Sequence, residues 1–388
     1  MTIGIDASRA FEKEKTGTEN YSFEIIKALA KIDRKNQYRL YLRSNFDSRL
    51  LKSLLLPDNF ETKLISWPRF WTQGGLALEV LKNPPDVLFI PAHTLPILRP
   101  RALKTVVTIH DLGAEFLPGF HTPWQREYLM FSTKYAVRNA SAIISVSKAT
   151  KDDLINKLKA DKRKIFVVYE GVDHGQFHPP ALTQRMGNKV EEVLQKYKIQ
   201  KPFFLYVGTI QPRKNLTRLI EAFSKVVKNP KVKLKSLNLV LAGKKGWLTD
   251  EIYEAPRKFQ IETRVKFLGY VSSEELVVLY SSCLALTMPS LVEGFGLPPL
   301  EAMACGAPAV LSQTSSLPEV GGDAAIYIDP KNPSDIAGAL EEILKMRPKE
   351  YEKLKTKSLE QAKKFSWEKA AKETLKVFEK VYENTSES

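Results

Sequence analysis

Residues 290–310 of this chain read SLVEGFGLPPLEAMACGAPAV, a short loop with two glutamates between apolar runs. The preceding run Ala285–Met288 is typical of a buried strand. Pro298–Pro299 favours a helix start, because the missing N–H of proline would be unpaired there in any case. The stretch therefore predicts a strand, a bare loop, a brief helix and a further strand. Glu293 and Glu301 would lie near the helix start, where unpaired N–H groups attract anions, which raises the question of what these carboxylates bind.

The same alternation of apolar runs and amphipathic segments extends along the whole chain and starts afresh at Phe203. Continuous apolar strands separated by helices predict parallel sheets that are covered on both faces. We therefore expect an α/β protein with two Rossmann-like, doubly wound domains, residues 1–180 and 181–365, followed by a last helix within 366–388. The segment 170–199 is the expected linker, since it opens with EGVDHGQFHPP and is rich in glycine, proline and polar residues. The strands expected are Ile3–Ala7, Tyr38–Leu42, Val87–Ile90, Thr105–Ile109, Ala142–Val146, Ile165–Val168, Phe203–Val207, Leu237–Ala242, Val265–Phe267, Cys283–Met288 and Ala325–Ile328. The helices expected are Asn20–Lys31, Pro123–Asn139, Lys148–Leu158, Leu216–Val227, Ser273–Ser281, Ser334–Met346, Lys349–Lys364 and Trp367–Tyr382.

The composition is that of a folded protein with 43% hydrophobic residues and a net charge of +15. With 388 residues the chain exceeds one ordinary core, which favours two domains. The positive charge suits nucleic acid, an anionic membrane face or a phosphorylated substrate, and solubility alone is a further explanation. The interleaved aromatic and basic residues of a known nucleic-acid module are missing, so we expect no nucleic-acid partner.

The two cysteines and five histidines indicate neither disulfides nor a metal site. Cys283 and Cys305 lie in apolar surroundings, which favours a reducing compartment, and the histidines lack metal-ligand spacing. Because the start MTIGIDAS runs directly into an apolar strand, we expect no signal peptide. No apolar run approaches the roughly 20 residues needed to span a bilayer. We expect a cytoplasmic protein without a metal or other cofactor.

In doubly wound sheets, ligands bind beyond the carboxyl ends of the strands, so the turns after the strands are the candidate sites. KTGTENY, residues 15–21, combines Gly17, which permits close backbone approach, with Thr18 as a helix cap; an ordinary capped helix start is the alternative. The segment is not G-x-G-x-x-G, so a nicotinamide cofactor gains no support. TIHDL places His110 at a strand end, where a structural histidine is the alternative to a catalytic one.

Three further turns belong to the second half of the chain. In VGTIQPRKN, Arg213 and Lys214 beside a helix start predict a phosphate clamp, because cations there oppose the helix dipole and need another reason to be present. FLGYVSSEEL places Val271 between a strand and a helix, where exposed backbone could meet a base, although its serines and glutamates also fit a plain helix cap. In the 290–310 stretch, Glu293 and Glu301 could act as acid and base or accept hydrogen bonds from sugar hydroxyls; solvated glutamates near a helix start are the alternative.

These segments together closely resemble the retaining glycosyltransferases of family 4. The signature E-x7-E is present as EGFGLPPLE, and the resemblance extends over TGTENY, HDL, EGVDHGQFHP, GTIQPRKN, FLGYVSSEELVVLYSSCLALTMPS and FSWEKAA. It implies a GT-B fold, with a nucleotide diphosphate sugar held mainly by the second domain. The acceptor, a glycan or a lipid-linked glycan, would lie mainly on the first domain. The last helix would cross back to the first domain.

The resemblance also implies roles for individual residues. Arg213 and Lys214 would bind the diphosphate, His110 would face the transferred sugar, and Glu301 would accept hydrogen bonds from the ribose. Many relatives carry an arginine where this chain has Thr209, so Arg213 would bear more of the diphosphate charge. The expected catalytic residues are His110, Glu293, Arg213 and Lys214. The expected donor-binding residues are Gly17, Thr18, Thr209, Arg213, Lys214, Val271, Glu293, Gly294, Phe295, Gly296, Leu297 and Glu301.

The resulting hypothesis is a retaining, metal-independent hexosyltransferase. Because G-T-x-x-P-R-K-N is frequent in the mannosyltransferase-like branch, GDP-mannose is the first donor, and UDP-glucose, UDP-galactose and UDP-N-acetylglucosamine stay open. An epimerase or a phosphorylase of the same fold is the alternative. A peripheral membrane contact is suggested by the aromatic segments SWPRFWTQGG and FHTPWQREYLMFSTKYAVR, with Trp67, Phe70, Trp71, Trp124, Tyr128 and Phe131 beside Arg69 and Lys134. Core packing and an acceptor pocket are the alternatives for the same aromatics.

Overall fold

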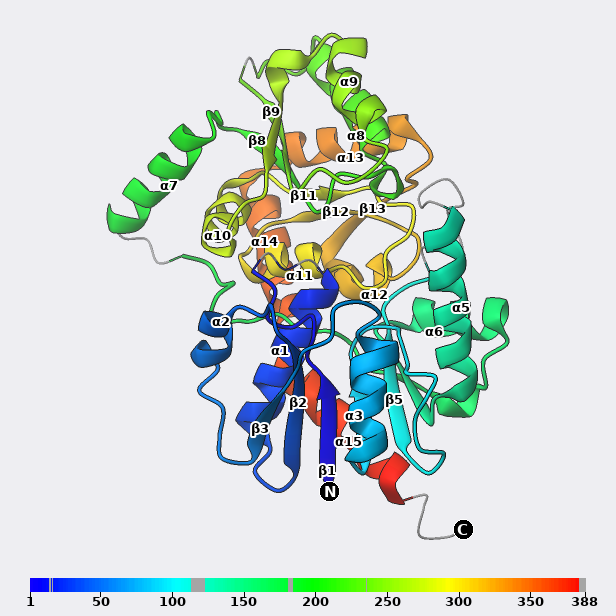
Figure 1. Ribbon diagram of the computed structural model, residues 1–388. Coiled ribbons are helices and arrows are strands. Elements are labelled where there is room, and N and C mark those ends of the chain that lie inside the picture. Colours follow the sequence, from blue (N-terminus) through cyan, green and yellow to red (C-terminus); the bar gives the residue numbers. More distant parts are fainter. Residues whose placement is uncertain (14, 16, 113–122, 181–183, 235, 384–388) are drawn as a thin grey trace. The chain divides into compact units, whose positions relative to one another are not determined.

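The computed structural model describes residues 1–388 except 14, 16, 113–122, 181–183, 235 and 384–388. It divides into two compact units (Figure 1). Unit 1 comprises Met1–Gly171 and Ser366–Ser388, and unit 2 comprises Val172–Phe365. The chain thus leaves unit 1 at Gly171, earlier than the expected boundary at residue 180. The reason is local: Val172 and Phe177 are buried, and the Phe177 ring packs at 6.2 Å from Tyr280 of unit 2.

The described part of unit 1 is built on a seven-stranded sheet in the order β3-β2-β1-β4-β5-β6-β7, and all of its strand pairs are parallel. The order reverses between β1 and β4, which places the switch point there. The strands are β1 Thr2–Asp6, β2 Gln37–Arg43, β3 Phe60–Ile65, β4 Val87–Ile90, β5 Lys104–Ile109, β6 Ala142–Ser145 and β7 Ile165–Val167. The helices are α1 Gly17–Ile32, α2 Ser48–Ser53, the π-helical turn η1 Thr72–Leu76, α3 Ala77–Lys82, α5 Pro123–Asn139, α6 Lys148–Leu158, η3 Lys162–Lys164 and α15 Trp367–Glu383.

Both faces of this sheet are covered, as the apolar strands require. Leu88 and Ile90 of β4 join a core that includes residues of α3, α5 and α6. Phe89 points to the other face, where its ring lies 5.1 Å from Phe378 of α15. The Tyr21 ring of α1 lies 5.9 Å from Trp367 at the start of α15, so α1 and α15 cover the second face together. The last helix therefore belongs to the first unit, as expected.

Unit 2 repeats the design with a six-stranded parallel sheet in its described part, in the order β10-β9-β8-β11-β12-β13. Here the order reverses between β8 and β11. The strands are β8 Phe203–Val207, β9 Asn238–Ala242, β10 Val265–Gly269, β11 Leu286–Met288, β12 Ala309–Ser312 and β13 Ala325–Ile328. The helices are α7 Gln184–Lys196, η4 Pro212–Lys214, α8 Leu216–Lys228, α9 Asp250–Lys258, η5 Glu262–Arg264, α10 Ser273–Ser282, α11 Leu297–Ala304, α12 Leu317–Gly321, η6 Gly322–Ala324, α13 Pro333–Lys345 and α14 Pro348–Ala362.

The expected fold of two doubly wound parallel sheets is confirmed, with local differences. The strand expected from Cys283 begins at Leu286, because Cys283 is the C-cap of α10. Strand β3 is absent from the expectation: its sequence FETKLI is exposed at four consecutive positions, as suits an edge strand. Cys283 and Cys305 are both free and buried.

Candidate functional site

The switch point of unit 2 is formed by the loops that follow β8 and β11. The first loop passes through the short turn η4 to Asn215, which adopts a left-handed conformation (φ +61°) before α8. The Asn215 side-chain amide donates to the carbonyl oxygens of Pro289 (3.0 Å) and Pro330 (2.6 Å). The Leu291 N–H donates to the Arg213 carbonyl at 2.9 Å. These bonds fix the two loops against each other at the carboxyl edge of the sheet.

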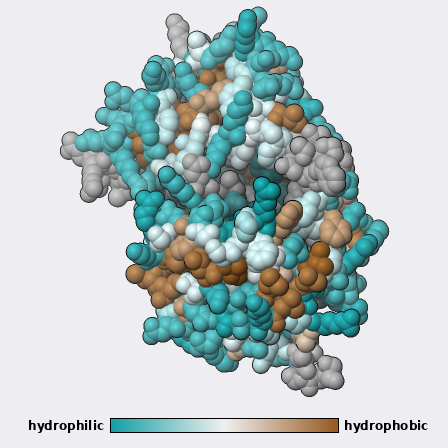
Figure 2. Space-filling view, viewed as in Figure 1, coloured by the Kyte–Doolittle hydropathy of each residue, from teal (hydrophilic) through white to brown (hydrophobic). Residues whose placement is uncertain are grey.

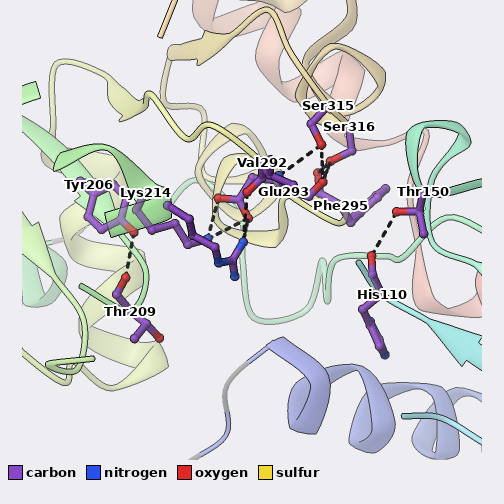
Figure 3. Close-up of polar contacts among 11 residues, drawn as sticks. His110, Thr150, Tyr206, Thr209, Lys214, Val292, Glu293, Phe295, Ser315 and Ser316 are labelled. Atoms are coloured by element: carbon purple, nitrogen blue, oxygen red, sulfur yellow. Dashed lines mark hydrogen bonds and ion pairs between the residues drawn. The ribbon is translucent and has the colours of Figure 1, made fainter. Parts of the chain in front are cut away.

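A buried cluster of charges joins the two loops (Figure 3). Lys214 Nζ donates to both carboxylate oxygens of Glu293, at 2.5 and 2.7 Å. Arg213 Nη1 lies 3.4 Å from Glu293 Oε2 and donates to the Val292 carbonyl at 3.0 Å. Only 10% of the Lys214 side chain and 8% of the Glu293 side chain are exposed, so water screens the pair weakly. Burial alone would raise the pKa of Glu293, but the two cations outweigh it and lower that pKa below its ordinary value.

The loop that carries Glu293 is held by two serines that precede α12. Ser315 Oγ donates to the Glu293 carbonyl at 2.6 Å and accepts from the Glu293 N–H at 3.2 Å. Ser316 Oγ lies within hydrogen-bond distance of the carbonyls of Glu293 (3.0 Å) and Phe295 (2.7 Å). Gly296 has φ +125° and is the N-cap of α11, a conformation that favours glycine. The backbone around Glu293 is therefore preorganised in the absence of a ligand.

The second glutamate of the motif lies on α11 and is held separately. The Tyr280 hydroxyl, on a fully buried side chain, donates to Glu301 Oε2 at 2.9 Å. Burial and the nearby Glu301 carboxylate raise the pKa of Tyr280 well above its ordinary value, so the hydroxyl stays a donor. The two carboxylates of the motif thus have different partners: Glu293 has cations and Glu301 has a neutral hydroxyl.

The other donor-side residues lie around these loops. The Thr209 carbonyl accepts from the Tyr206 hydroxyl at 3.3 Å. The side chains of Val271, Phe295 and Leu297 are buried, and so is Gly294, so any ligand contact at Val271 and Phe295 would come from backbone. The helix after Val271 begins with a capping box between Ser272 and Glu275, which is the plain helix start kept open above.

In unit 1, His110 lies at the carboxyl end of β5 and is largely buried. Its Nε2 is 2.8 Å from the Pro91 carbonyl oxygen and its Nδ1 is 3.2 Å from Glu170 Oε1. Because both partners are acceptors, the two contacts favour the doubly protonated imidazolium. Burial opposes this charge, but the hydrogen bond and charge of Glu170 and the Pro91 carbonyl raise the pKa of His110 above its ordinary value. Both ring nitrogens are occupied within unit 1, so the side chain offers no spare nitrogen to the transferred sugar.

Gly17 and Thr18 lie in the first turn of α1, because that helix begins at Gly17. The expectation that Thr18 caps the helix is therefore wrong: Thr18 is already inside, and its carbonyl accepts from the Ser22 hydroxyl at 2.8 Å. A side chain at Gly17 would meet no atom of the structure within 4 Å, so the space beside this backbone is open.

Several residues of these sites were not predicted. Ser315 and Ser316 resemble an ordinary helix cap in the sequence, yet their hydroxyls bind the Glu293 loop instead. Tyr280 stands in a helical run and Glu170 at the expected linker. Among the described residues, no group of three or more His, Cys, Asp or Glu side chains is placed to hold a metal ion.

Comparisons with known proteins cover both units. A family model described as Glycosyltransferase Family 4 matches residues 15–176, and one described as Glycosyl transferases group 1 matches residues 189–365. The chain is 27% identical over 389 residues to O-antigen chain mannosyltransferase B of Escherichia coli, covering 96% of this chain and 98% of the relative. It is 30% identical over 251 residues to O-antigen chain mannosyltransferase RfbU of Salmonella typhimurium, covering 65% and 63%.

Solved structures share the fold at low sequence identity. Sucrose-phosphate synthase from Thermosynechococcus elongatus superimposes with a TM-score of 0.75 at 19% identity, covering 99% of both chains. Anabaena Alr3699/HepE, solved in complex with UDP-glucose, gives a TM-score of 0.72 at 16% identity, covering 100% of this chain and 99% of the other.

Proposed function

This chain belongs to the family 4 glycosyltransferases and has their GT-B fold, and from that premise we propose that it transfers mannose from GDP-mannose to a hydroxyl of a glycan or lipid-linked acceptor. The choice of mannose is supported by the relative of nearly equal length that is named an O-antigen chain mannosyltransferase. The observation that carries the assignment of the site is the cluster of Lys214, Arg213 and Glu293 at the switch point of unit 2. Switch points are where doubly wound sheets bind nucleotides.

The two cations of this cluster suit a leaving diphosphate. Arg213 offers a planar fork of donors and Lys214 a compact point charge, and together they can balance charge that develops on the leaving oxygen. We therefore propose transfer without a metal ion. When the diphosphate binds the two cations, the Glu293 carboxylate would instead accept hydrogen bonds from hydroxyls of the transferred sugar. Glu301, oriented by Tyr280, would accept hydrogen bonds from the ribose.

We also propose that the anomeric configuration is retained because the acceptor oxygen attacks C1 from the same side as the leaving group departs. The bond between the acceptor oxygen and C1 forms as the bond between C1 and the phosphate oxygen breaks, and the diphosphate takes the acceptor proton. Glu293 is a poor nucleophile for a double displacement, because two cations hold its charge.

A ligand panel tests the donor assignment. Thermal shifts with GDP, UDP, ADP and their sugars rank affinity, since a bound ligand stabilises by RT ln(1 + [L]/Kd). GDP and GDP-mannose are expected to give the largest shifts, and a larger shift with UDP sugars would overturn the choice of base. NMR of the product, with and without a chelator, tests retention and metal independence. Conversion of the donor sugar to its epimer without an acceptor would indicate an epimerase, and a requirement for free phosphate would indicate a phosphorylase.

Peripheral contact with the cytoplasmic face of a membrane is part of the proposal. Trp67 and Phe70 are 41% and 74% exposed beside the exposed Arg69, whereas Trp71 is buried in the core. Hydrophobic residues gather on the face of unit 1 seen in Figure 2. Tyr128 and Phe131 are also exposed, and the side chain of Trp124 lies outside the described residues. Among the described residues, no helix is long and apolar enough to cross a bilayer.

Liposome sedimentation tests this contact. Pelleting with vesicles that contain anionic lipid is expected, and it should be reduced in Phe70→Ser but not in Leu248→Ser, a matched exposed residue of unit 2 (60% exposed). Equal pelleting of the two variants, or no pelleting of the wild type, would contradict the contact.

A further inference from the structure

His93 lies at the switch point of unit 1, in the loop directly after β4. Its N–H donates to the Thr108 carbonyl of β5 at 3.1 Å, and its backbone is left-handed, with φ +46°. Such a conformation is uncommon for a residue other than glycine, and strained positions of this kind gather at functional sites. The position is also the one at which an open α/β sheet binds its ligand.

The surroundings of His93 keep its ring neutral. The ring centre lies 5.5 Å from that of His110, whose imidazolium form is favoured by Glu170 from the segment after β7 and by the Pro91 carbonyl. Arg9 adds positive charge from the segment after β1, while Asp111 acts in the opposite sense. Burial first, and then the His110 charge, lower the pKa of His93 to about 3. The ring therefore stays uncharged at any physiological pH.

A neutral imidazole has one N–H donor and one nitrogen acceptor. The His93 side chain is half-buried, and no described residue makes a hydrogen bond with its ring nitrogens in this structure. His110, one strand away, has both nitrogens occupied. The two histidines of this edge thus differ: the ring nitrogens of His110 are both occupied, and His93 presents a donor and an acceptor that match two neighbouring oxygens of an uncharged polyol.

We propose that His93 binds the acceptor at its reacting hydroxyl. Its N–H donates to the oxygen of the hydroxyl that receives the sugar, and its unprotonated ring nitrogen accepts a hydrogen bond from a neighbouring acceptor hydroxyl, so the proton of the reacting hydroxyl stays free to move. In the transfer, the acceptor oxygen bonds to C1 and its proton goes to the leaving diphosphate, so His93 keeps its own proton throughout. This inference rests on the proposed function and adds a residue of unit 1 to it. Glu170 and His110 are then positioning residues, because they act on the acceptor through His93.

Two variants of His93 test the proposal. His93→Phe keeps a ring but removes both nitrogens, and His93→Gly suits the left-handed backbone and leaves room for free imidazole. We expect kcat/KM for the acceptor to fall about 30-fold in both variants, as for the loss of two hydrogen bonds of about 1 kcal/mol each. Added imidazole should restore much of the loss in His93→Gly only. Slow hydrolysis of GDP-mannose without acceptor, and the thermal shift caused by GDP, should stay within twofold of the wild type.

His178→Phe is the matched control, since His178 is an exposed histidine outside both sites. Unchanged acceptor kinetics in His93→Phe would overturn the inference, and so would an equal fall of donor hydrolysis and acceptor transfer. A wild type that neither hydrolyses a nucleotide sugar nor transfers from one would overturn the proposed function itself, and these outcomes are distinguishable.

Discussion

The two units place a buried ion pair at the same kind of position, the carboxyl edge of a parallel sheet, but they balance it differently. In unit 2 a single carboxylate, Glu293, meets two basic side chains, Lys214 and Arg213. In unit 1 the carboxylate of Glu170 meets the titratable cation His110, and the neighbouring His93 is neutral. The edge of unit 2 has positive charge to spare for an anionic ligand, whereas the edge of unit 1 suits an uncharged one. Under the proposed function, the edge of unit 2 would take the charged donor and the edge of unit 1 the neutral acceptor.

Removal of Lys214 should have the largest effect on activity. In Lys214→Met, turnover with GDP-mannose is expected to fall about 10²- to 10³-fold, the range seen when one preorganised group that stabilises the transition state is lost. The variant should also melt at a lower temperature, because Glu293 loses a buried partner. Initial rates and thermal unfolding measure the two effects.

The double variant Lys214→Met/Glu293→Gln separates them. It should regain much of the melting temperature without regaining turnover, since no carboxylate is left unpaired. Lys225→Met, at an exposed position of α8, is the control and should change neither quantity. Near-normal turnover of Lys214→Met would contradict its role at the diphosphate.

Loss of the Tyr280 hydroxyl should have a smaller effect, on the affinity for the nucleotide. Tyr280→Phe removes the donor that orients Glu301, and GDP is expected to bind roughly three- to tenfold more weakly, as for the loss of one hydrogen bond of about 1 kcal/mol. Calorimetry measures the change. Tyr327→Phe is the matched control, because the Tyr327 hydroxyl donates to the Gly322 carbonyl at 2.7 Å rather than to the site. Equal weakening in both variants would show that Glu301 has no special part.

The smallest effect expected is a dependence of stability on pH with opposite sign in the two units. The pKa of His110 is raised in the folded state. The ion pair of His110 with Glu170 therefore stabilises the fold fully below about pH 6.5, the pKa of histidine in the unfolded chain. This contribution is lost as the pH rises through the folded pKa. The pKa of Glu293 is lowered, so its contribution is present above about pH 4.5 and is lost as the pH falls through the folded pKa. A tenfold difference in acidity between the folded and unfolded states corresponds to about 1.4 kcal/mol of unfolding free energy.

Denaturant unfolding of the wild type, His110→Asn and Glu293→Gln across pH 4 to 9 measures these contributions. The difference between the wild type and His110→Asn should shrink toward alkaline pH, and that between the wild type and Glu293→Gln should shrink toward acid pH. Differences that do not vary with pH would contradict the raised pKa of His110 and the lowered pKa of Glu293.

The sequence predicts those parts of the molecule whose causes are local. Val87–Ile90 and Phe203–Val207 are continuous apolar runs, and the structure has strands with the same bounds. The polar edge strand β3 has no such signal. Lys214 and Glu293 could be anticipated as site residues because each stands in a glycine-containing turn after a strand, but the ion pair between them could not. The partners of Glu293, Glu301 and His110 could not: Ser316, Tyr280 and Glu170 are ordinary in their own segments, and His110 and Glu170 are 60 residues apart. The left-handed backbone of His93 likewise leaves no mark in the sequence.

The two passages of the chain between the units touch at Gly171, where an added Cβ would lie 2.1 Å from the Trp367 backbone nitrogen. Unit 2 is therefore a continuous insertion in unit 1, and this fixes an order of events on the ribosome. Unit 2 can fold as soon as residues 172–365 have emerged. Unit 1, most of which is synthesised earlier, cannot be completed before α15 emerges, because Phe378 of α15 packs against Phe89. Until then one face of the first sheet is left uncovered. The part of the protein that is synthesised first is thus completed last, and a nascent chain halted before Trp367 would expose that face to chaperones and to other nascent chains.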